Sequence, residues 1–425
     1  MLQALLAGVA SIKAHQTRMD AIGNDLANVD TTAYKSSSVS FAEMIAQTVT
    51  GASAPNGSIG GRNPVQIGLG VIVSATNTNE AQGSLNATNN PTDLAVQGNG
   101  LFMVSDGSGI DYSRDGSFTL DANGDMVQTS TGRKLVGWRA DSLGKVDTTQ
   151  SIDPSKTVNI PIGTLNAVQG TTNVTLTGNL SSAALATDSW STTTRVYDSL
   201  GNPSDLTVTF KNHSTTMGPG APAGAVSSWD WDATVGGSSV GSSSSTGNQP
   251  IYFDAAGNIV NGTALGAISV PGQNGAVNQA ENLDFSAIHQ LATATQVSVQ
   301  NQNGFGPGSL ESFQIGNDGL ITGVFTNGLT RPLGQVALAT FPNPAGLQRV
   351  GSNLWTTTVN SGTPNVGAPQ LNGRGSIQSG FLEQSNVDIS TAFTDLIVTQ
   401  RGFQANTKIV QTVDEMLQDL INLKR

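Results

Sequence analysis

The sequence predicts a multidomain, mainly β protein. We expect two β-rich domains, the second inserted in the first, plus an α-helical coiled-coil-like domain made of the N- and C-terminal helices. Apolar residues recur at three-and-four spacing at both chain ends, as in helices that bury one face. Alternating segments between turn signals fill the middle of the chain, as in strands. The chain has 50 glycines among its 425 residues, and only 12% of its residues are charged. This composition favours an extracellular structural protein over a compact enzyme.

Charge and composition exclude several classes of partner. The net charge is -11, which argues against nucleic acid or an anionic membrane held by a basic patch. The sequence contains no cysteine, so disulfides and thiolate metal sites are excluded. No stretch approaches the roughly 18 apolar residues of a membrane span, so we expect no membrane insertion. Lys13 and Arg18 follow the first apolar residues instead of preceding them, so we expect export by a route without a cleaved signal peptide.

The two chain ends, residues 1–30 and 386–425, are expected to form the helical domain. The apolar stripe consists of Leu2, Leu5, Val9, Ile12, Met19 and Leu26 in the first helix and of Ile389, Leu396, Phe403, Val410, Val413, Leu417 and Leu420 in the second. Periodicity alone leaves two interpretations equal: the helices pack within one molecule, or they pack on other copies. Burial against one partner helix barely offsets the conformational entropy of ordering such a helix, which favours several partners.

The first helix is followed by a recognisable motif. Residues 24–35 read Asn-Asp-Leu-Ala-Asn-Val-Asp-Thr-Thr-Ala-Tyr-Lys. This run resembles the N-terminal signature of the bacterial flagellar rod and hook family, carried here by Leu26, Ala27, Asn28, Thr31, Tyr34 and Lys35. Ala33 stands where the family usually has Gly. Because Gly readily adopts a positive φ, Ala33 implies a different local turn.

The next segments are expected to form a linker and a discontinuous β domain. Residues 31–70 are interpreted as a linker holding one short helix or hairpin, and 366–385 as the return linker. Residues 71–145 and 286–365 are expected to form the β domain. Gly98, Asn99, Gly100 and Phe102 resemble a second family signature. The pairs Asp115-Gly116, Asn123-Gly124, Asp318-Gly319 and Asn327-Gly328 predict hairpin turns.

Residues 146–285 are expected to form the inserted outer β domain, with loops at 214–225 and 236–248. Tyr197, Asp198 and Gly201 resemble a segment typical of the hook members of the family. Gln404, Ala405 and Asn406 resemble the family's C-terminal signature. The resemblance therefore covers both ends and the middle of the chain in the right order.

This resemblance implies a subunit that assembles with many copies of itself into a curved, hollow helical tube, a universal joint between flagellar rod and filament. The implied partners are the distal rod protein, the hook cap protein, the hook-filament junction protein and the flagellar export apparatus. The implied location is the extracellular flagellum, reached through the flagellar type III pathway. Two alternatives stay open. They are a distal rod subunit, and a secreted β-rich carbohydrate-active enzyme, which would need a pair of carboxylates that the sequence does not show.

No catalytic, cofactor-binding or metal-ligating residues are expected. Residues 237–241 match G-x-S-x-G but lie in a Gly/Ser tract that we interpret as a loop, without the strand and helix of a nucleophile elbow. His15, His213 and His289 are scattered over an expected helix, loop and domain junction. Asp121 to Asp125 lack the ligand order of an EF-hand calcium loop, so a hairpin turn is the expectation.

Overall fold

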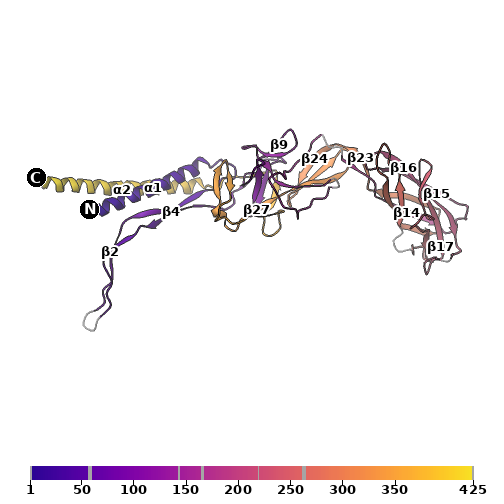
Figure 1. The fold of residues 1–425 in the computed structure, drawn as a ribbon, viewed down its shortest axis with the longest axis horizontal. Helices are drawn as coiled ribbons and strands as arrows, with labels where there is room; N and C mark the ends of the chain where they lie inside the picture. The colour runs from indigo at the N-terminus through magenta and orange to yellow at the C-terminus, as the bar shows by residue number, and fades with distance from the viewer. Residues whose placement is uncertain are drawn as a thin grey trace. The chain divides into compact units, whose positions relative to one another are not determined.

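The chain folds into two compact units joined by several crossings of the chain. In the computed structural model, the described residues are 2–55, 60–141, 144–163, 167–218, 220–260 and 265–423. Unit 1 comprises Met1–Ile160, Gln314–Ile321 and Leu333–Arg425, and unit 2 comprises Pro161–Phe313 and Thr322–Pro332. A long helix lies at each chain end, and strands dominate the described residues between them (Figure 1). The predicted fold class, mainly β with terminal helices, is confirmed.

The terminal helices are α1 (Leu2–Ala27) and α2 (Ile389–Leu423), and they lie side by side in unit 1 (Figure 1). Arg18 on α1 pairs with Asp395 on α2 at 3.3 Å. Helix α2 begins where it does because the Asp388 carboxylate accepts hydrogen bonds from the backbone N–H groups of the next turn, at 2.8 and 3.1 Å. A capping aspartate satisfies donors that have no partner inside the helix.

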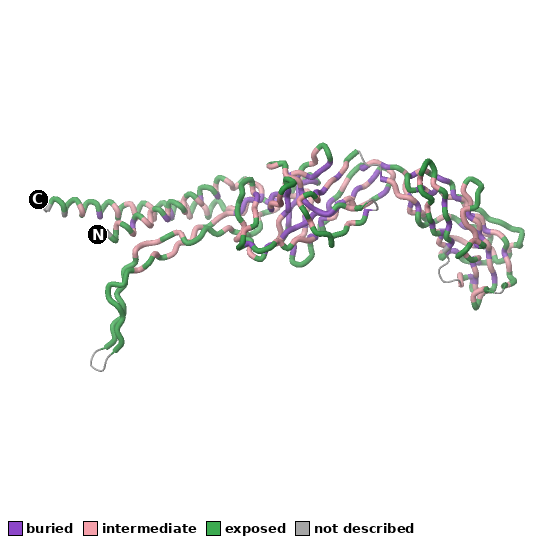
Figure 2. Tube along the Cα trace, in the orientation of Figure 1, coloured by how far each residue is buried: buried purple, intermediate pink, exposed green. Residues whose placement is uncertain are grey.

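In place of the linker expected at 31–70, the described residues 37–55 and 60–78 form a two-stranded ribbon, which includes residues 71–78 that were expected in the β domain. Strand β1 (Ser37–Glu43) pairs antiparallel with β4 (Val71–Thr78), and β2 (Ala46–Thr50) pairs with β3 (Val65–Gly68). The β1–β4 part packs against α1, where a Cβ on Gly70 would lie 3.1 Å from the Cα of Ala7. The β2–β3 part is exposed on both faces (Figure 2). The Gly- and Pro-rich run that suggested a linker lies in the sequence between β2 and β3.

Strands from two distant stretches of the sequence build the β core of unit 1. The main sheet has the order β28-β29-β8-β7-β11-β10-β9, and β27 joins it beside β7. Tyr112 packs edge-on against Phe341 with ring centroids 4.8 Å apart, and Phe102 does so against Phe118 at 5.4 Å. The strands of the main sheet and the flanking strands are β5 (Leu85–Ala87), β6 (Leu94–Gln97), β7 (Leu101–Ser105), β8 (Ile110–Ser113), β9 (Phe118–Leu120), β10 (Met126–Gln128), β11 (Lys134–Leu135), β12 (Gly137–Arg139), β27 (Leu338–Thr340), β28 (Gln348–Gly351), β29 (Leu354–Thr356), β30 (Asn365–Gly367), β31 (Ser376–Ser379) and β32 (Phe381–Glu383).

Two of the expected hairpin turns in this unit have different outcomes. Asn123-Gly124 joins β9 to β10, which pair antiparallel, and Gly124 has a φ of 80°. Asp115-Gly116 does not form a hairpin, because β8 pairs with β7 and β29 while β9 pairs with β10. Gly116 is needed there for another reason. Its backbone passes so close to Leu94 that a Cβ would overlap the Leu94 carbonyl oxygen.

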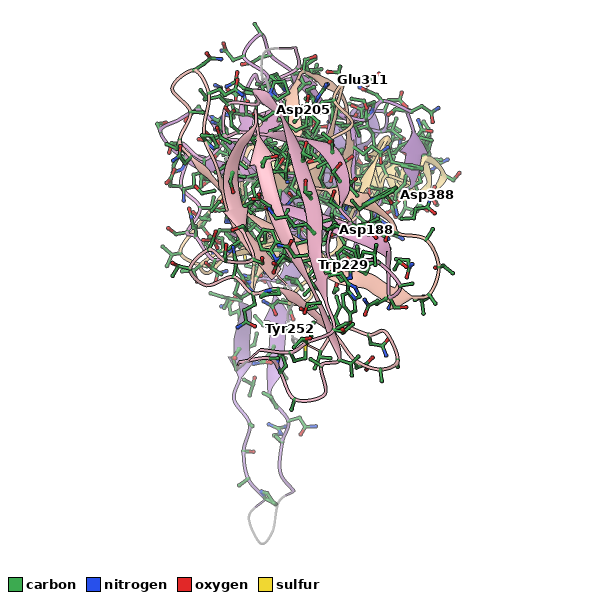
Figure 3. The ribbon with its side chains drawn as sticks, turned by 90° about the vertical axis from the view of Figure 1, so that its right-hand side faces the viewer. Asp188, Asp205, Trp229, Tyr252, Glu311 and Asp388 are labelled. Carbon is green, nitrogen blue, oxygen red and sulfur yellow. The ribbon has the colours of Figure 1, made fainter. Side chains whose placement is uncertain are left out.

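Unit 2 is a β sandwich. One sheet has the order β20-β21-β14-β22, and the other has the order β15-β16-β17-β18, with β19 beside β17. Alternate residues of β16 and β17 point inward, and Trp231 and Phe210 of this sheet contact Phe285 of the other, with ring centroids 5.4 and 6.0 Å apart. The buried Trp229 lies on the same strand as Trp231 (Figure 3). The strands are β13 (Ala167–Gln169), β14 (Asn173–Ser181), β15 (Trp190–Tyr197), β16 (Pro203–Ser214), β17 (Ser227–Val235), β18 (Ser238–Ser242), β19 (Ile251–Phe253), β20 (Leu265–Val270), β21 (Gln279–Leu291), β22 (Gln296–Gln302) and β23 (Phe305–Gly308).

The division into units differs from the expected boundaries at 145/146 and 285/286. The second boundary falls inside β21, which pairs with β14 on both sides of it, and β22 pairs with β14 as well. At the other boundary, Val158 and Ile160 are buried in unit 1, and the Val158 N–H donates to the Leu135 carbonyl at 2.8 Å. Residues 238–242 form β18 where a loop was expected. The strands β24 (Leu310–Ile315), β25 (Leu320–Phe325) and β26 (Thr330–Val336) contain the later crossings between the units.

Candidate functional site

Part of the apolar stripe lies in the contact between the two helices. Val413 is 3% exposed, and Val410 reaches into a notch at Gly8, where a Cβ would lie 3.0 Å from its Cγ2. Val9 and Ile389 are exposed, and the side chains of Leu2 and Leu420 lie outside the described residues. The half-buried members are Leu5, Ile12, Met19, Leu26, Leu396, Phe403 and Leu417.

Five apolar residues of α2 face solvent outside the stripe, and we call them the outward row: Phe393 and Ile397 lie on one side of the exposed helix face, and Val398, Ile409 and Met416 lie on the other side. Phe393, Ile397 and Val398 are 48%, 56% and 57% exposed, and Ile409 and Met416 are 46% and 48% exposed. The sequence signal was present, because Ile389, Phe393 and Ile397 follow one another at intervals of four residues. Helix α2 therefore carries large apolar side chains that the chain itself leaves exposed, in addition to the partly buried stripe.

At the base of the helix pair, the N-terminal signature folds into a tight turn. Ala33 has a φ of 56°, so it adopts the left-handed conformation, and its N–H donates to the Glu383 carbonyl at 2.8 Å. The prediction of a different local turn at Ala33 is therefore wrong, because the alanine itself adopts a positive φ. The Tyr34 hydroxyl donates to the Asp25 carboxylate at 2.8 Å and accepts from the Asn24 amide at 2.9 Å. These bonds hold the end of α1 against the start of the ribbon.

A buried ion cluster joins three distant segments, and we call Lys35, Arg114 and Glu383 the clasp. The Glu383 carboxylate is 2.6 Å from the Lys35 Nζ and 2.6 Å from the Arg114 Nε. Its side chain is fully buried, and those of Lys35 and Arg114 are 6% and 7% exposed. Burial alone would raise the pKa of Glu383, but the charges of Arg114 and Lys35 and their hydrogen bonds hold it below its usual value.

The clasp also connects the first and second family signatures. The Arg114 guanidinium donates to the carbonyl oxygens of Val96 and Gly98, each at 2.7 Å, and also to that of Gly100. Gly98 and Gly100 have φ values of 98° and 139°, which glycine adopts readily. Asn99 lines a cavity of about 350 Å³ that Lys35 and Arg114 also line, and Phe102 is fully buried.

Two further side chains tie the return segment and the sheet to the same turn. The Asn386 amide accepts from the Ser36 N–H at 2.8 Å and donates to the Asn79 and Ala81 carbonyls at 2.8 and 2.9 Å. The Arg349 guanidinium lies between the rings of Tyr34 and Trp355, 5.2 and 4.8 Å from their centroids. Sequence reasoning missed Arg114, Arg349, Glu383 and Asn386, because no local pattern marks them.

The other signature residues have local structural roles. In unit 2, Asp198 is buried and accepts hydrogen bonds from the N–H groups of Leu200 and Asn202, each at 2.9 Å. Burial opposes the charge of Asp198, yet these bonds hold its pKa below the usual value. Gly201, in the same turn, has a φ of 81°, and Tyr197 precedes it. On α2, Gln404 and Ala405 are exposed, and the Asn406 amide donates to the Gly402 carbonyl at 2.9 Å.

The described residues contain no group of three or more His, Cys, Asp and Glu side chains placed to hold a metal ion. His15, His213 and His289 lie on α1, β16 and β21, respectively. The G-x-S-x-G match lies on and before the edge strand β18. No described helix is long and apolar enough to cross a membrane.

Comparisons with known proteins agree with this architecture. Three family models match: "Flagellar hook protein FlgE/F/G D1 domain" over residues 95–181, "Flagellar basal body protein FlaE D2 domain" over 164–305, and "Flagellar basal body rod FlgEFG protein C-terminal" over 378–423. These matches define the class, the rod and hook proteins of the bacterial flagellum.

Curated relatives narrow the class. The chain is 36% identical to the flagellar hook protein FlgE of Borreliella burgdorferi and 34% identical to that of Treponema pallidum, each over 100% of both chains. It is 32% identical to FlgE of Escherichia coli over 98% of each chain. The crystal structure of Helicobacter pylori FlgE2 shares the fold, with a TM-score of 0.50 at 14% identity over 70% of this chain and 100% of that one. The chain belongs to the flagellar hook protein family, whose members are structural subunits of the hook.

Proposed function

We propose that this chain polymerises through its terminal helices into a curved, hollow tube that transmits torque as a universal joint. The observation that carries the proposal is that large apolar side chains on two sides of α2, Phe393 and Ile397 on one and Ile409 and Met416 on the other, are about half exposed. A soluble helix pair has no need of so much exposed apolar surface, and such surface commonly marks interaction sites. Contacts of one face with a different face of the next copy propagate as a helical polymer when the rotation between copies does not close a ring.

The β2–β3 part of the ribbon supports the same proposal. An isolated two-stranded hairpin is at best marginally stable in water. Here both faces are exposed, and Ile45, Val49 and Val65 are 80%, 59% and 54% exposed. Packing against neighbouring copies would bury these residues. The stripe residues would then order the helix pair while the outward row and the ribbon contact other copies, and sliding between outer β units would allow bending.

The partners and the export route are part of the proposal. The distal rod protein and the hook-filament junction protein would contact the two ends of the tube, and the hook cap protein would cover its growing end. The subunit would leave the cell unfolded through the flagellar export apparatus. Terminal helices that order only on assembly suit that route, because the chain is threaded before it packs.

A substitution in the outward row tests the proposal. Ile397→Asp places a charge at an exposed site, so the chain should stay folded but fail to form tubes on negative-stain electron microscopy. Gln411→Asp, at an exposed and already polar position of the same helix, is the matched control and should assemble normally. Tubes of normal length from Ile397→Asp would contradict the role of the row.

The stripe is tested separately. The double variant Phe403→Asp, Val410→Asp should leave a soluble, folded β core that does not polymerise, because it charges the half-buried contact between α1 and α2. Normal assembly of this variant would show that the helix pair is not needed for the tube.

A further inference from the structure

The side chain of His15 lies where three elements of unit 1 meet. On α2, Gly402 leaves room for the ring, since a Cβ there would lie 2.8 Å from its Cε1. On β1 of the ribbon, Phe41 packs edge-on against the ring with centroids 5.6 Å apart. The Nδ1 atom is buried and has no hydrogen-bond partner among the described residues. The imidazole therefore packs against both the second helix and the ribbon.

The surroundings favour the neutral ring. Burial lowers the pKa of His15, and the positive charge of Arg18, one turn along α1, lowers it further. Asp395 on α2 is paired with Arg18 at 3.3 Å, and the ring's pKa is not raised by an acid. Strand β4 has no charged side chain. The other charged residues of the packed elements are Lys13, Asp20 and Asp25 on α1, Glu43 on β1, and Arg401, Lys408, Asp414, Glu415 and Asp419 on α2.

We propose that His15 is a proton-sensitive contact, whose protonation separates the helix pair from the ribbon and thereby weakens assembly in mild acid. A proton on the buried ring nitrogen would add a donor without an acceptor, beside Phe41 and near Arg18. This inference rests on the proposed function, because the helix pair is expected to pack fully only in the polymer. The established role as a hook subunit does not require it.

Proton linkage gives the direction of the pH dependence of assembly. Because the pKa of His15 is lowered in the packed state, the neutral ring makes its full contribution to assembly above the ordinary histidine pKa of about 6.5. That contribution is lost as the pH falls from there through the lowered pKa of the packed ring. Assembly should therefore weaken between about pH 7.5 and pH 5.5, above the range in which ordinary carboxylates titrate.

The critical concentration for polymerisation of the full chain measures this effect. We expect it to rise from pH 7.5 to pH 5.5, by no more than about tenfold, because pH 5.5 is about one unit below the ordinary histidine pKa. His15→Leu keeps an apolar side chain in the notch and should make the critical concentration nearly constant over this range. His289→Gln, which removes an exposed histidine from unit 2, is the matched control and should keep the wild-type profile.

Equal pH profiles for wild type and His15→Leu would overturn the inference. If His15→Leu does not assemble, proton uptake during disassembly of the wild-type polymer at pH 6 decides the question. A net uptake of a fraction of one proton per subunit supports the proposal, and no uptake overturns it. A wild-type chain that forms no polymer at any pH would instead contradict the proposed function.

Discussion

The N–H of Ala33 donates a 2.8 Å hydrogen bond to the carbonyl oxygen of Glu383, so two residues 350 positions apart by sequence number close the base of the helix pair. The same Glu383 places its carboxylate between Lys35 and Arg114. The end of α1, the glycine turn at residues 98–100 and the entry to α2 therefore depend on one another. This arrangement gives the terminal helices a fixed attachment to the β core of unit 1.

Glu383→Gln should destabilise unit 1 by about 3 kcal/mol, because it leaves two buried cations without their anion. Urea unfolding of the full chain measures the change. Asp205→Asn, which breaks the exposed Arg195–Asp205 pair of unit 2, is the control and should change little. The pKa of Glu383 is lowered, so its contribution is present above pH 4.5 and is lost as the pH falls through its folded-state pKa. An unchanged unfolding midpoint for Glu383→Gln at neutral pH would contradict the structural role of the clasp.

Ala33→Gly should be neutral or stabilising by up to about 1.5 kcal/mol. Relief of the left-handed conformation is worth ~1–2 kcal/mol, and the added freedom of glycine in the unfolded chain costs ~0.5–1 kcal/mol. Ala33→Val should lose at least about 2 kcal/mol at this buried site. The control Ala75→Gly, in an exposed position of β4 without positive φ, should be destabilising. If thermal unfolding shows Ala33→Gly and Ala75→Gly to be equally destabilising, the strain at Ala33 is not real.

Glu281 should make unit 2 less stable as the pH rises. The side chain is 1% exposed, neither carboxylate oxygen has a hydrogen-bond partner among the described residues, and burial raises its pKa to about 8. The unfolded chain loses this proton near pH 4.5, so stability falls between there and about pH 8, by up to about 5 kcal/mol at ~1.4 kcal/mol per pKa unit. Below pH 4.5 and above pH 8 the group adds no further pH dependence.

Unfolding of unit 2 at pH 5 and pH 8 checks this, because Trp229 and Trp231 lie in its core and report on it by fluorescence. Glu281→Leu should be more stable than wild type at pH 8 and should lose most of the difference between the two pH values. Glu311→Gln, at an exposed position, is the control and should behave as wild type (Figure 3). An unaltered pH dependence in Glu281→Leu would rule out Glu281 as its source.

Gly116→Ala should destabilise unit 1 by about 1–3 kcal/mol, the usual range for overpacking. The added methyl group would overlap the Leu94 carbonyl and lie 3.0 Å from the Phe102 ring. Gly109→Ala is the matched control, since a Cβ there meets nothing within 4 Å and its φ is not positive. Chemical denaturation measures the free energy of unfolding of both variants. Equal values would mean that the backbone at Gly116 does not pass so close to Leu94.

Sequence reasoning succeeded where the physical signal is local. The spacing of Leu396, Phe403 and Val410 predicted α2, because helical periodicity persists over many turns. It failed where partners are distant. Nothing near Glu383 in the sequence indicates that it meets Arg114, and the domain boundary at 285 was misplaced because β21 continues the alternating pattern through it. The ribbon was interpreted as a linker because its strands are short and the segment between them is rich in glycine.

The candidate site, too, could be predicted from the sequence only in part. The stripe is visible as periodicity, but which of two apolar rows faces the partner helix depends on how α1 and α2 are rotated, and this is set by contacts such as Gly8 with Val410. The positive φ of Ala33 could not be predicted, because local sequence favours another turn and the Glu383 bond overrides it.

Electron cryomicroscopy of the concentrated, purified chain would show whether it assembles through its terminal helices. We predict hollow helical tubes, with α1 and α2 packed around the channel and the outward row of α2 buried against neighbouring copies. A chain that stays monomeric at high concentration, or tubes in which Ile397 and Phe393 remain exposed to solvent, would contradict it.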